Sequence, residues 1–208
     1  LKSGVEIHTE TTVKNFQVLG NSISSVVTDH QNFEVDEVVL AAGAWTEELL
    51  KPLKIALSVQ AGKGYRINVE APTGISIPSV LMESKVGVTP MQGFTRFAGT
   101  MEIAGINHSI RVNRVNAIAK AATQYYSGLK INVKDRKQAK CGLRPLSPDG
   151  LPFIGRHSSC SNLVLATGHS MMGWSLGPAT GKLVTEIISN KKLSMPIDAF
   201  LPERKYGS

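Results

Sequence analysis

The residues best suited to chemistry lie in two glycine-rich stretches of the last third of the chain. Residues 168–175, Gly-His-Ser-Met-Met-Gly-Trp-Ser, follow an apolar run and precede a helical pattern. A helix start of this kind exposes backbone N–H groups and partial positive charge, which suits an anion or a polarised carbonyl. The alternative is an ordinary strand-to-helix turn, with Ser175 as the helix N-cap and His169 as a hydrogen-bonded loop residue.

Arg144 is the second candidate for chemistry. It stands between Leu143 and Pro145 in residues 142–155, a stretch that we expect to be buried. A buried guanidinium needs an anion, because leaving it unpaired is strongly destabilising, and its planar fork matches a carboxylate. The anion is either a substrate carboxylate or a structural partner such as Asp149. The residues alone leave both interpretations open.

Other kinds of site find no support in the sequence. Residues 62–65, Gly-Lys-Gly-Tyr, lack the third glycine and the following helix of a phosphate-binding loop. Cys141 and Cys160 form no CxxC pair and have no histidine at metal-ligand spacing, so we expect reduced thiols, a cytoplasmic compartment and no metal. No HExxH or Walker motif occurs, and no Ser-His-Asp order, so hydrolase and metalloenzyme classes have no basis.

The composition is that of a soluble globular protein. Of 208 residues, 42% are hydrophobic and 19% are charged, which excludes a disordered polymer, a collagen-like repeat and a disulfide-stapled miniprotein. The net charge of +7 favours acidic partners. The positive charges are scattered, so a solvated basic surface is expected. A basic RNA-binding module is the alternative, but it needs clustered basic and aromatic residues that the sequence does not show.

The hydropathy pattern places these motifs on a mixed fold. Strands are expected at residues 5–9, 11–18, 23–28, 37–42 and 162–167. A short helix at 47–51 is expected to be capped by Thr46, and a later helix is expected to be capped by Asn113 and to stop at Gly128. Residues 57–110 show short alternating segments separated by Gly and Pro, which is typical of antiparallel sheet. The C-terminal helix is expected over residues 175–190.

Three segments together resemble the FAD-dependent D-amino-acid oxidase superfamily, and within it the bacterial D-amino-acid dehydrogenases. Residues 142–155 are similar to its motif G-L-R-P-x-[ST]-P-D-G-x-P-x-[IV]-G, and residues 167–175 to T-G-H-x-x-x-G-W-[ST]. Residues 12–16 and 37–45 resemble its paired strands ending in A-x-G-x-W. The GxGxxG unit with which the family cradles the FAD pyrophosphate does not occur here. We therefore expect the C-terminal part of a longer enzyme, inactive alone.

The resemblance implies a fold and an activity. The fold is α/β (mixed α+β): a partial FAD-binding, Rossmann-like domain from residues 1–56 and 141–208, and an antiparallel substrate-binding domain from residues 57–140. The activity is oxidative deamination of D-amino acids to 2-oxo acids and ammonia by hydride transfer to flavin N5, with a quinone or O2 as electron acceptor. A glycine- or sarcosine-type amine oxidase using O2, or a non-catalytic remnant, is the alternative. Peripheral contact with the inner membrane is compatible with the basic surface.

The resemblance also implies roles for individual residues. Arg144 would bind the substrate carboxylate, with Tyr65 and Met101 as weaker pocket candidates, and no side chain is assigned as a catalytic base. Val13 would contact the adenine through its backbone, Ala42 and Gly43 would let the dinucleotide approach, and Trp45 would pack beside it. The residues expected to surround the flavin ring are Gly168, His169, Ser170, Met171, Met172, Gly173, Trp174 and Ser175.

Overall fold

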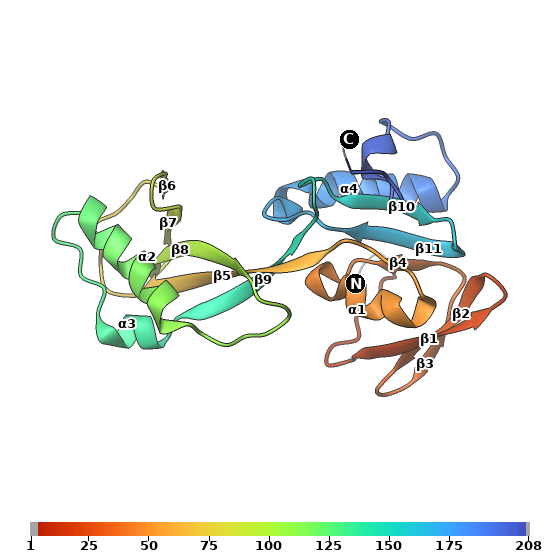
Figure 1. The fold of residues 1–208 in the computed structure, drawn as a ribbon, viewed down its shortest axis with the longest axis horizontal. Helices are drawn as coiled ribbons and strands as arrows, with labels where there is room; N and C mark the ends of the chain where they lie inside the picture. Colours follow the sequence, from red (N-terminus) through yellow and green to blue (C-terminus); the bar gives the residue numbers. More distant parts are fainter. Residues whose placement is uncertain (1–3, 207–208) are drawn as a thin grey trace. The chain divides into compact units, whose positions relative to one another are not determined.

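The computed structural model describes residues 4–206, and the chain divides into two compact units (Figure 1). Leu1–Gln60 and Pro145–Ser208 form the first, which we call the discontinuous unit. Ala61–Arg144 form the second, which we call the inserted unit. Helices and strands occur in both, so the mixed α/β class expected from the sequence is confirmed.

The discontinuous unit contains two small sheets. The first is antiparallel and is built from β1 (Val13–Leu19), β2 (Ser22–Thr28) and β3 (Asn32–Glu34). The second has the order β10-β11-β4, from β10 (Phe153–His157), β11 (Cys160–Thr167) and β4 (Val38–Leu40). β11 pairs antiparallel with β10 and parallel with β4. Helix α4 (Gly173–Ile188) packs against β10 and β11, and α1 (Thr46–Leu50) packs against β1 (Figure 1). The 3-10 turns are Gly43–Trp45, Lys51–Leu53 and Asp198–Phe200.

One buried amide joins the two sheets of the discontinuous unit. Asn162 on β11 accepts a hydrogen bond from the Ile23 N–H of β2 at 2.8 Å and donates to the Ile23 carbonyl at 2.8 Å. It also donates to the Asp36 carbonyl at 3.0 Å. A buried amide left unpaired would cost about 1–3 kcal/mol, so these bonds hold β2 and the approach to β4 in register with β11. The core beneath them is apolar and includes Ile23, Leu50, Phe153, Leu163 and Leu165.

Arg204 binds the C-terminal segment of the chain to the Pro-Asp-Gly turn. Its Nε and Nη2 donate to the two carboxylate oxygens of Asp149 at 2.8 and 2.9 Å. Its amino groups also donate to the carbonyls of Leu151 and Pro152. The guanidinium carbon lies 4.1 Å from the centroid of the Phe153 ring. The anion that balances Arg204 is therefore Asp149, in a bidentate geometry that fixes the direction of the turn.

This pair predicts a pH-dependent contribution to stability. The hydrogen bonds from Arg204 lower the pKa of Asp149 from its ordinary 3.8 to about 2. A carboxyl whose pKa is depressed by folding stabilises the native state above its unfolded pKa, and this contribution is lost as the pH falls from 3.8 through about 2. We therefore expect Asp149→Asn to unfold at lower urea than the wild type at pH 7 and to approach it near pH 2. An equal difference in midpoint at both pH values would contradict this assignment.

The inserted unit is a five-stranded sheet of order β6-β7-β8-β5-β9 with one main helix. Its elements are β5 (Gln60–Val69), β6 (Ser79–Leu81), β7 (Val86–Met91), β8 (Phe94–Ile103), α2 (Val112–Tyr125), α3 (Val133–Lys137) and β9 (Lys140–Leu146). β5 and β8 pair antiparallel over most of their length. Helix α2 lies against β7 and β8.

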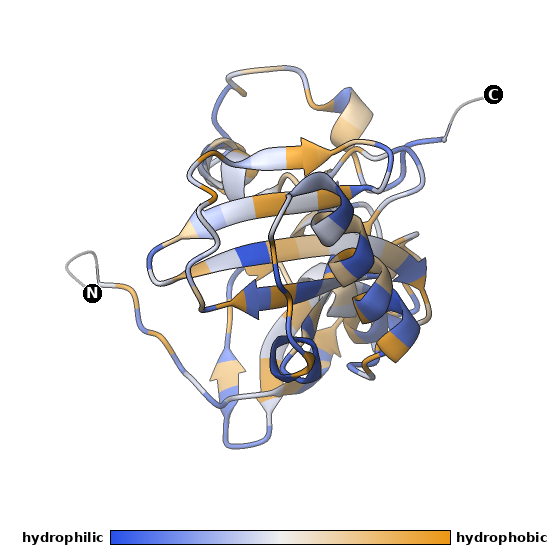
Figure 2. Ribbon diagram, turned by 90° about the vertical axis from the view of Figure 1, so that its left-hand side faces the viewer, coloured by the Kyte–Doolittle hydropathy of each residue, from blue (hydrophilic) through white to orange (hydrophobic). Residues whose placement is uncertain are grey.

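Alternation along β5 separates the two faces of this sheet. Tyr65, Ile67 and Val69 are at most 1% exposed and belong to the core beneath α2. Because successive side chains of a strand point to opposite faces, Gly64, Arg66 and Asn68 lie on the face away from α2. In Figure 2, the hydropathy of the residues changes from one residue to the next along the strands. The face away from α2 is therefore the polar one.

Several local expectations are wrong. Residues 5–9 alternate, but no strand pairs with them, and Val5 and Ile7 are 52% and 67% exposed. An alternating sequence pattern does not form a strand when no neighbouring strand hydrogen-bonds to it. Residues 133–137, for which no helix was predicted, form helix α3, and Asn132 and Asp135 make a capping box at its start. None of the expected caps holds: Thr46 is the first residue of α1, and the caps of α2 and α4 are Arg111 and Met172.

Two features are absent from residues 4–206. No helix there combines the length and the apolar character that a membrane span needs. No three His, Cys, Asp or Glu side chains in this part of the chain come together as a metal site would require.

Candidate functional site

The first candidate site lies where two parallel strands end together. Leu40 at the end of β4 is the register partner of Leu165 near the end of β11. The backbone that leaves β4 at residues 41–45 and the backbone that leaves β11 at residues 168–172 therefore meet at one edge of the sheet. Ligands of open α/β sheets bind at this carboxyl edge. The structure thus brings together two motifs that are more than 120 positions apart in the chain.

Buried threonines hold these two segments against each other. The Thr46 hydroxyl donates to Thr167 Oγ1 at 3.1 Å, and the Thr167 hydroxyl donates to the Gly43 carbonyl at 3.2 Å. Gly43 has a φ of +57°, and no heavy atom lies within 4 Å of the position that a Cβ would take there. Its neighbour Ala42 is half-buried. The backbone at Gly43 therefore has room for the close approach of a ligand.

The loop after β11 has a shape fixed by its own contacts. Gly168 has a φ of +79°, and a Cβ there would lie 2.9 Å from Phe153 Cδ2, so packing as well as backbone conformation requires glycine. Ser170, with a φ of +52°, donates its N–H to the Pro145 carbonyl at 2.9 Å. The Met172 N–H donates to the His169 carbonyl at 2.8 Å. These bonds turn the chain directly into α4.

The amino end of α4 is the electrostatic feature of this site. The first bond of the helix runs from the Leu176 N–H to the Met172 carbonyl, and Met172 supplies no side-chain cap. The N–H groups of Gly173, Trp174 and Ser175 therefore have no acceptor within the helix. A 16-residue helix adds partial positive charge at this end. The arrangement can hold an anion or an electron-rich carbonyl edge.

His169 has a structural partner. Its Nε2 lies 2.9 Å from the hydroxyl of Thr180, which is about two helical turns from the start of α4. Burial lowers the pKa of His169, so the neutral ring is favoured near pH 7. The ring is thus fixed against its own helix, in agreement with the interpretation as a hydrogen-bonded loop residue.

Large apolar side chains are exposed beside this helix start. Trp174 is 96% exposed, Met171 73% and Met172 54%. Further along α4, a Cβ at Gly177 or Gly181 would meet no atom within 4 Å. Exposed apolar surface of this kind marks a binding face. Two other residues that were expected to contact the cofactor lie on different segments of the discontinuous unit. Trp45 is 42% exposed. Val13 is half-buried and is the first residue of β1, where its register partner is Thr28 of β2.

The second candidate site lies wholly in the inserted unit. Arg144 stands on β9, and its guanidinium packs on Gly64 of the neighbouring strand β5, where a Cβ would contact Nη1 and lie 2.9 Å from Cζ. The side chain borders a cavity of about 380 Å³. No carboxylate of the described residues pairs with it. The alternative interpretation of Arg144, a structural ion pair with Asp149, is wrong, because Arg204 binds both oxygens of that carboxylate.

The two weaker pocket candidates fall on opposite faces of the sheet. Met101 is the cross-strand partner of Gly64, so it shares the face of Arg144, and it is 49% exposed. Tyr65 borders the cavity as a residue of β5, but the residue is only 1% exposed. Its hydroxyl donates to Glu102 Oε1 at 2.7 Å on the face of α2. Tyr65 can therefore position β5, while its ring lies in the core.

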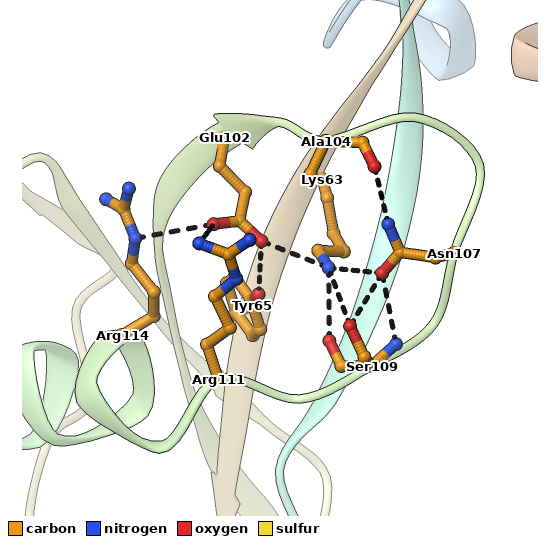
Figure 3. Close-up of polar contacts among 8 residues, drawn as sticks. All are labelled: Lys63, Tyr65, Glu102, Ala104, Asn107, Ser109, Arg111 and Arg114. Carbon is orange, nitrogen blue, oxygen red and sulfur yellow. Dashed lines mark hydrogen bonds and ion pairs between the residues drawn. The ribbon is translucent and has the colours of Figure 1, made fainter.

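A buried polar cluster was missed by the sequence analysis (Figure 3). Lys63 is fully buried, its Nζ lies 3.0 Å from Glu102 Oε1, and it donates to Asn107 and Ser109. Arg111 approaches the other carboxylate oxygen at 3.4 Å. Burial opposes the charge of Lys63, but the bonds to Glu102 and Tyr65 outweigh it and raise its pKa. The available signal was a lysine at an inward position of a strand, two residues before Tyr65. The cluster anchors residues 104–111 to the sheet.

The sequence matches a described family over most of its length. The model of a family described as "FAD dependent oxidoreductase" covers residues 1–187. The chain is 32% identical to a D-amino acid dehydrogenase of Bradyrhizobium diazoefficiens over 97% of this chain and 48% of the relative. A D-amino acid dehydrogenase of Rhodopseudomonas palustris is 34% identical over 88% of this chain and 43% of the relative. The chain spans about half the length of the curated relatives it matches.

Solved structures share the fold. An L-proline dehydrogenase from P. horikoshii aligns with a TM-score of 0.84 at 20% identity, over 97% of this chain and 55% of that one. A glycine oxidase from Geobacillus kaustophilus aligns with a TM-score of 0.77 at 24% identity, over 95% of this chain and 53% of that one. These likenesses concern the fold alone.

Proposed function

Because the chain belongs to the family of FAD-dependent oxidoreductases, we propose that it forms the C-terminal half of an enzyme that oxidises D-amino acids. The D-amino acid dehydrogenases to which it is about 30% identical support this substrate class. The products would be a 2-oxo acid and ammonia. In this proposal the discontinuous unit is part of the FAD-binding domain and the inserted unit is the substrate-binding domain.

The observation that carries the proposal is the environment of Arg144. Its guanidinium lies on a glycine at the border of a cavity, and no described carboxylate neutralises it. A planar fork of donors in this situation suits a carboxylate bound from solution. Every amino acid supplies one. Arg144 would therefore hold the α-carboxylate and orient the α-carbon for oxidation.

The carboxyl edge of β4 and β11 fits FAD. The open N–H groups of Gly173, Trp174 and Ser175 suit the carbonyl-bearing edge of the flavin ring, and the exposed Met171 and Met172 suit its apolar surface. The free backbone surface at Gly43 suits the dinucleotide. Gly177 and Gly181 leave α4 open where the half that carries the GxGxxG unit would pack.

The residues of this chain then have separate tasks. When bound, FAD would act as the hydride acceptor, with its N5 atom receiving the hydride from the substrate α-carbon. The amino end of α4 stabilises negative charge that develops at the edge it faces. Arg144 binds the carboxylate, and the substrate amine gives up its proton before oxidation, so no side-chain base is required. The imino acid that results takes up water and releases ammonia.

The test uses the flavin-loaded enzyme, that is, this chain together with the GxGxxG-bearing half. Under anaerobic conditions D-alanine or D-proline is added, and the visible absorbance of the flavin is followed. We expect bleaching by the D-enantiomers and none by the L-enantiomers. A flavin that stays oxidised with every D-amino acid would overturn the substrate class.

The electron acceptor is decided by a second readout. Stoichiometric hydrogen peroxide in air would identify an oxidase of the glycine or sarcosine type. Reduction of a quinone without peroxide would identify a dehydrogenase. In the second case the net charge of +7 would favour contact of the enzyme with an anionic membrane surface.

A further inference from the structure

Two more arginines share the sheet face of Arg144. Arg66 on β5 lies opposite Ala98, and Arg96 on β8 lies opposite Asn68. In an antiparallel pair these positions are diagonal neighbours on one face. Arg66, Arg96 and Arg144 all line the cavity of about 380 Å³ in the inserted unit. Three arginines therefore border one cavity.

Their charges are not neutralised by the protein. None of the residues that line this cavity is acidic, and none of the ion pairs within residues 4–206 involves these arginines. Arg96 is held in place, since its Nε donates to Asn68 Oδ1 at 3.1 Å and its guanidinium lies 5.3 Å from the Phe94 ring centroid. Burial and then the neighbouring charge of Arg66 lower the pKa of Arg96. The two cations are close enough to repel each other.

One carboxylate does not account for three guanidiniums. Arg144 lies over Gly64, and Arg66 follows two residues along the same strand, a displacement of about 7 Å. An anion bound by Arg66 and Arg96 would therefore be separate from the one on Arg144, and it would relieve the repulsion between the two. The arrangement calls for a ligand with two carboxylates.

We propose that Arg66 and Arg96 bind a second carboxylate of the substrate, so that the enzyme prefers amino-acid substrates that carry two carboxylates. This inference rests on the proposed function, in which Arg144 takes the α-carboxylate. The second carboxylate is supplied either by an acidic side chain, as in D-aspartate and D-glutamate, or by an acidic substituent on nitrogen, as in iminodiacetate.

The first experiment measures kcat/KM of the flavin-loaded enzyme for D-glutamate, D-aspartate, iminodiacetate, D-glutamine and D-alanine. We expect a dicarboxylate to exceed D-glutamine and D-alanine by about tenfold to a hundredfold, the range of one charged hydrogen-bonded contact. Arg66→Gln and Arg96→Gln are each expected to abolish that preference, by lowering kcat/KM for the dicarboxylate to the level of D-glutamine. Arg66→Lys should retain part of it, because the charge remains without the fork. Lys120→Gln makes the same change of charge at an exposed position of α2 and is the control.

The second experiment measures binding to the flavin-loaded enzyme by calorimetry, with dicarboxylates that carry no amine and are therefore not oxidised. Succinate and glutarate are expected to bind at least tenfold more tightly than propionate, and Arg66→Gln to remove the difference. Thermal unfolding of each variant establishes that it is folded.

The outcomes separate the two proposals. Bleaching of the flavin by D-alanine with no preference for dicarboxylates would leave the proposed function in place and overturn this inference. Arg66-dependent binding of succinate, without oxidation of any D-amino acid, would support the dicarboxylate site and overturn the proposed function. Preference for iminodiacetate over D-glutamate would assign the second carboxylate to the nitrogen substituent, and the reverse order to the side chain.

Discussion

Replacing Arg144 with alanine is expected to lower kcat/KM for D-amino acids by about 30-fold to several thousandfold in the flavin-loaded enzyme. This range corresponds to about 2–5 kcal/mol, the usual loss when one partner of a desolvated charge pair is removed. The substrate carboxylate would enter the cavity without its cation. Steady-state kinetics measure the loss, and the ratio of flavin absorbance to protein should be unchanged, because the expected flavin contacts lie at residues 41–45 and 168–175.

Two variants make this experiment specific. Arg144→Lys keeps the charge but not the bidentate geometry, so it should recover only part of the activity. Lys140→Ala removes an exposed cation from the same strand β9 and should leave kcat/KM within about twofold, as for ordinary surface changes. Wild-type kcat/KM in Arg144→Ala would show that another group binds the carboxylate.

The second large effect is expected from a single added methyl group. In Gly64→Ala the new Cβ would contact Nη1 of Arg144 and lie 2.9 Å from Cζ and 3.1 Å from Nη2. These atoms are the end of a flexible side chain, so the guanidinium should move aside without loss of the fold. Misplacement of a binding group by about 1 Å can cost on the order of a hundredfold in rate. We expect kcat/KM to fall by about that factor, with little change in the thermal midpoint.

The same cavity offers a matched control for the methyl group. Gly142 lies on β9, lines the cavity, and has nothing within 4 Å of its Cβ position. Gly142→Ala should therefore retain wild-type kinetics. In a double-mutant cycle, adding Gly64→Ala to Arg144→Ala should have almost no further effect, because both act on one guanidinium. Additive losses, or an equal loss in Gly142→Ala, would contradict the role assigned to Gly64.

Local pattern was enough to predict the elements around the first candidate site. The run 37–42 contains β4, the run 162–167 falls within β11, and helix α4 follows after a short loop. These predictions succeeded because a buried strand and an amphipathic helix each carry a local period. The caps were wrong, because the bonds that a side chain makes depend on its tertiary neighbours: the Thr46 hydroxyl bonds Thr167 of β11 instead of capping α1.

The partners of charged side chains were beyond the reach of the sequence. Arg144 and Asp149 are near in sequence, yet Asp149 pairs with Arg204, 55 positions further along the chain. In the sequence, Lys63 stands in a Gly-Lys-Gly stretch that does not meet the pattern of a phosphate-binding loop. In the structure it is a buried lysine that pairs with Glu102. Long-range contacts of this kind follow from how sheets and loops assemble, and no local period encodes them.

By itself, then, the sequence determined the mixed fold class and the family and singled out Arg144 as a candidate, because these rest on motifs and local periods. Only the tertiary structure decided which charges remain unpaired. Strand register across β5 and β8 places Arg66 and Arg96 on the face of Arg144 and places Tyr65 on the other. The physical reason is that a strand has two faces and its partner sets the register, so one pairing shift would change which side chains face a ligand.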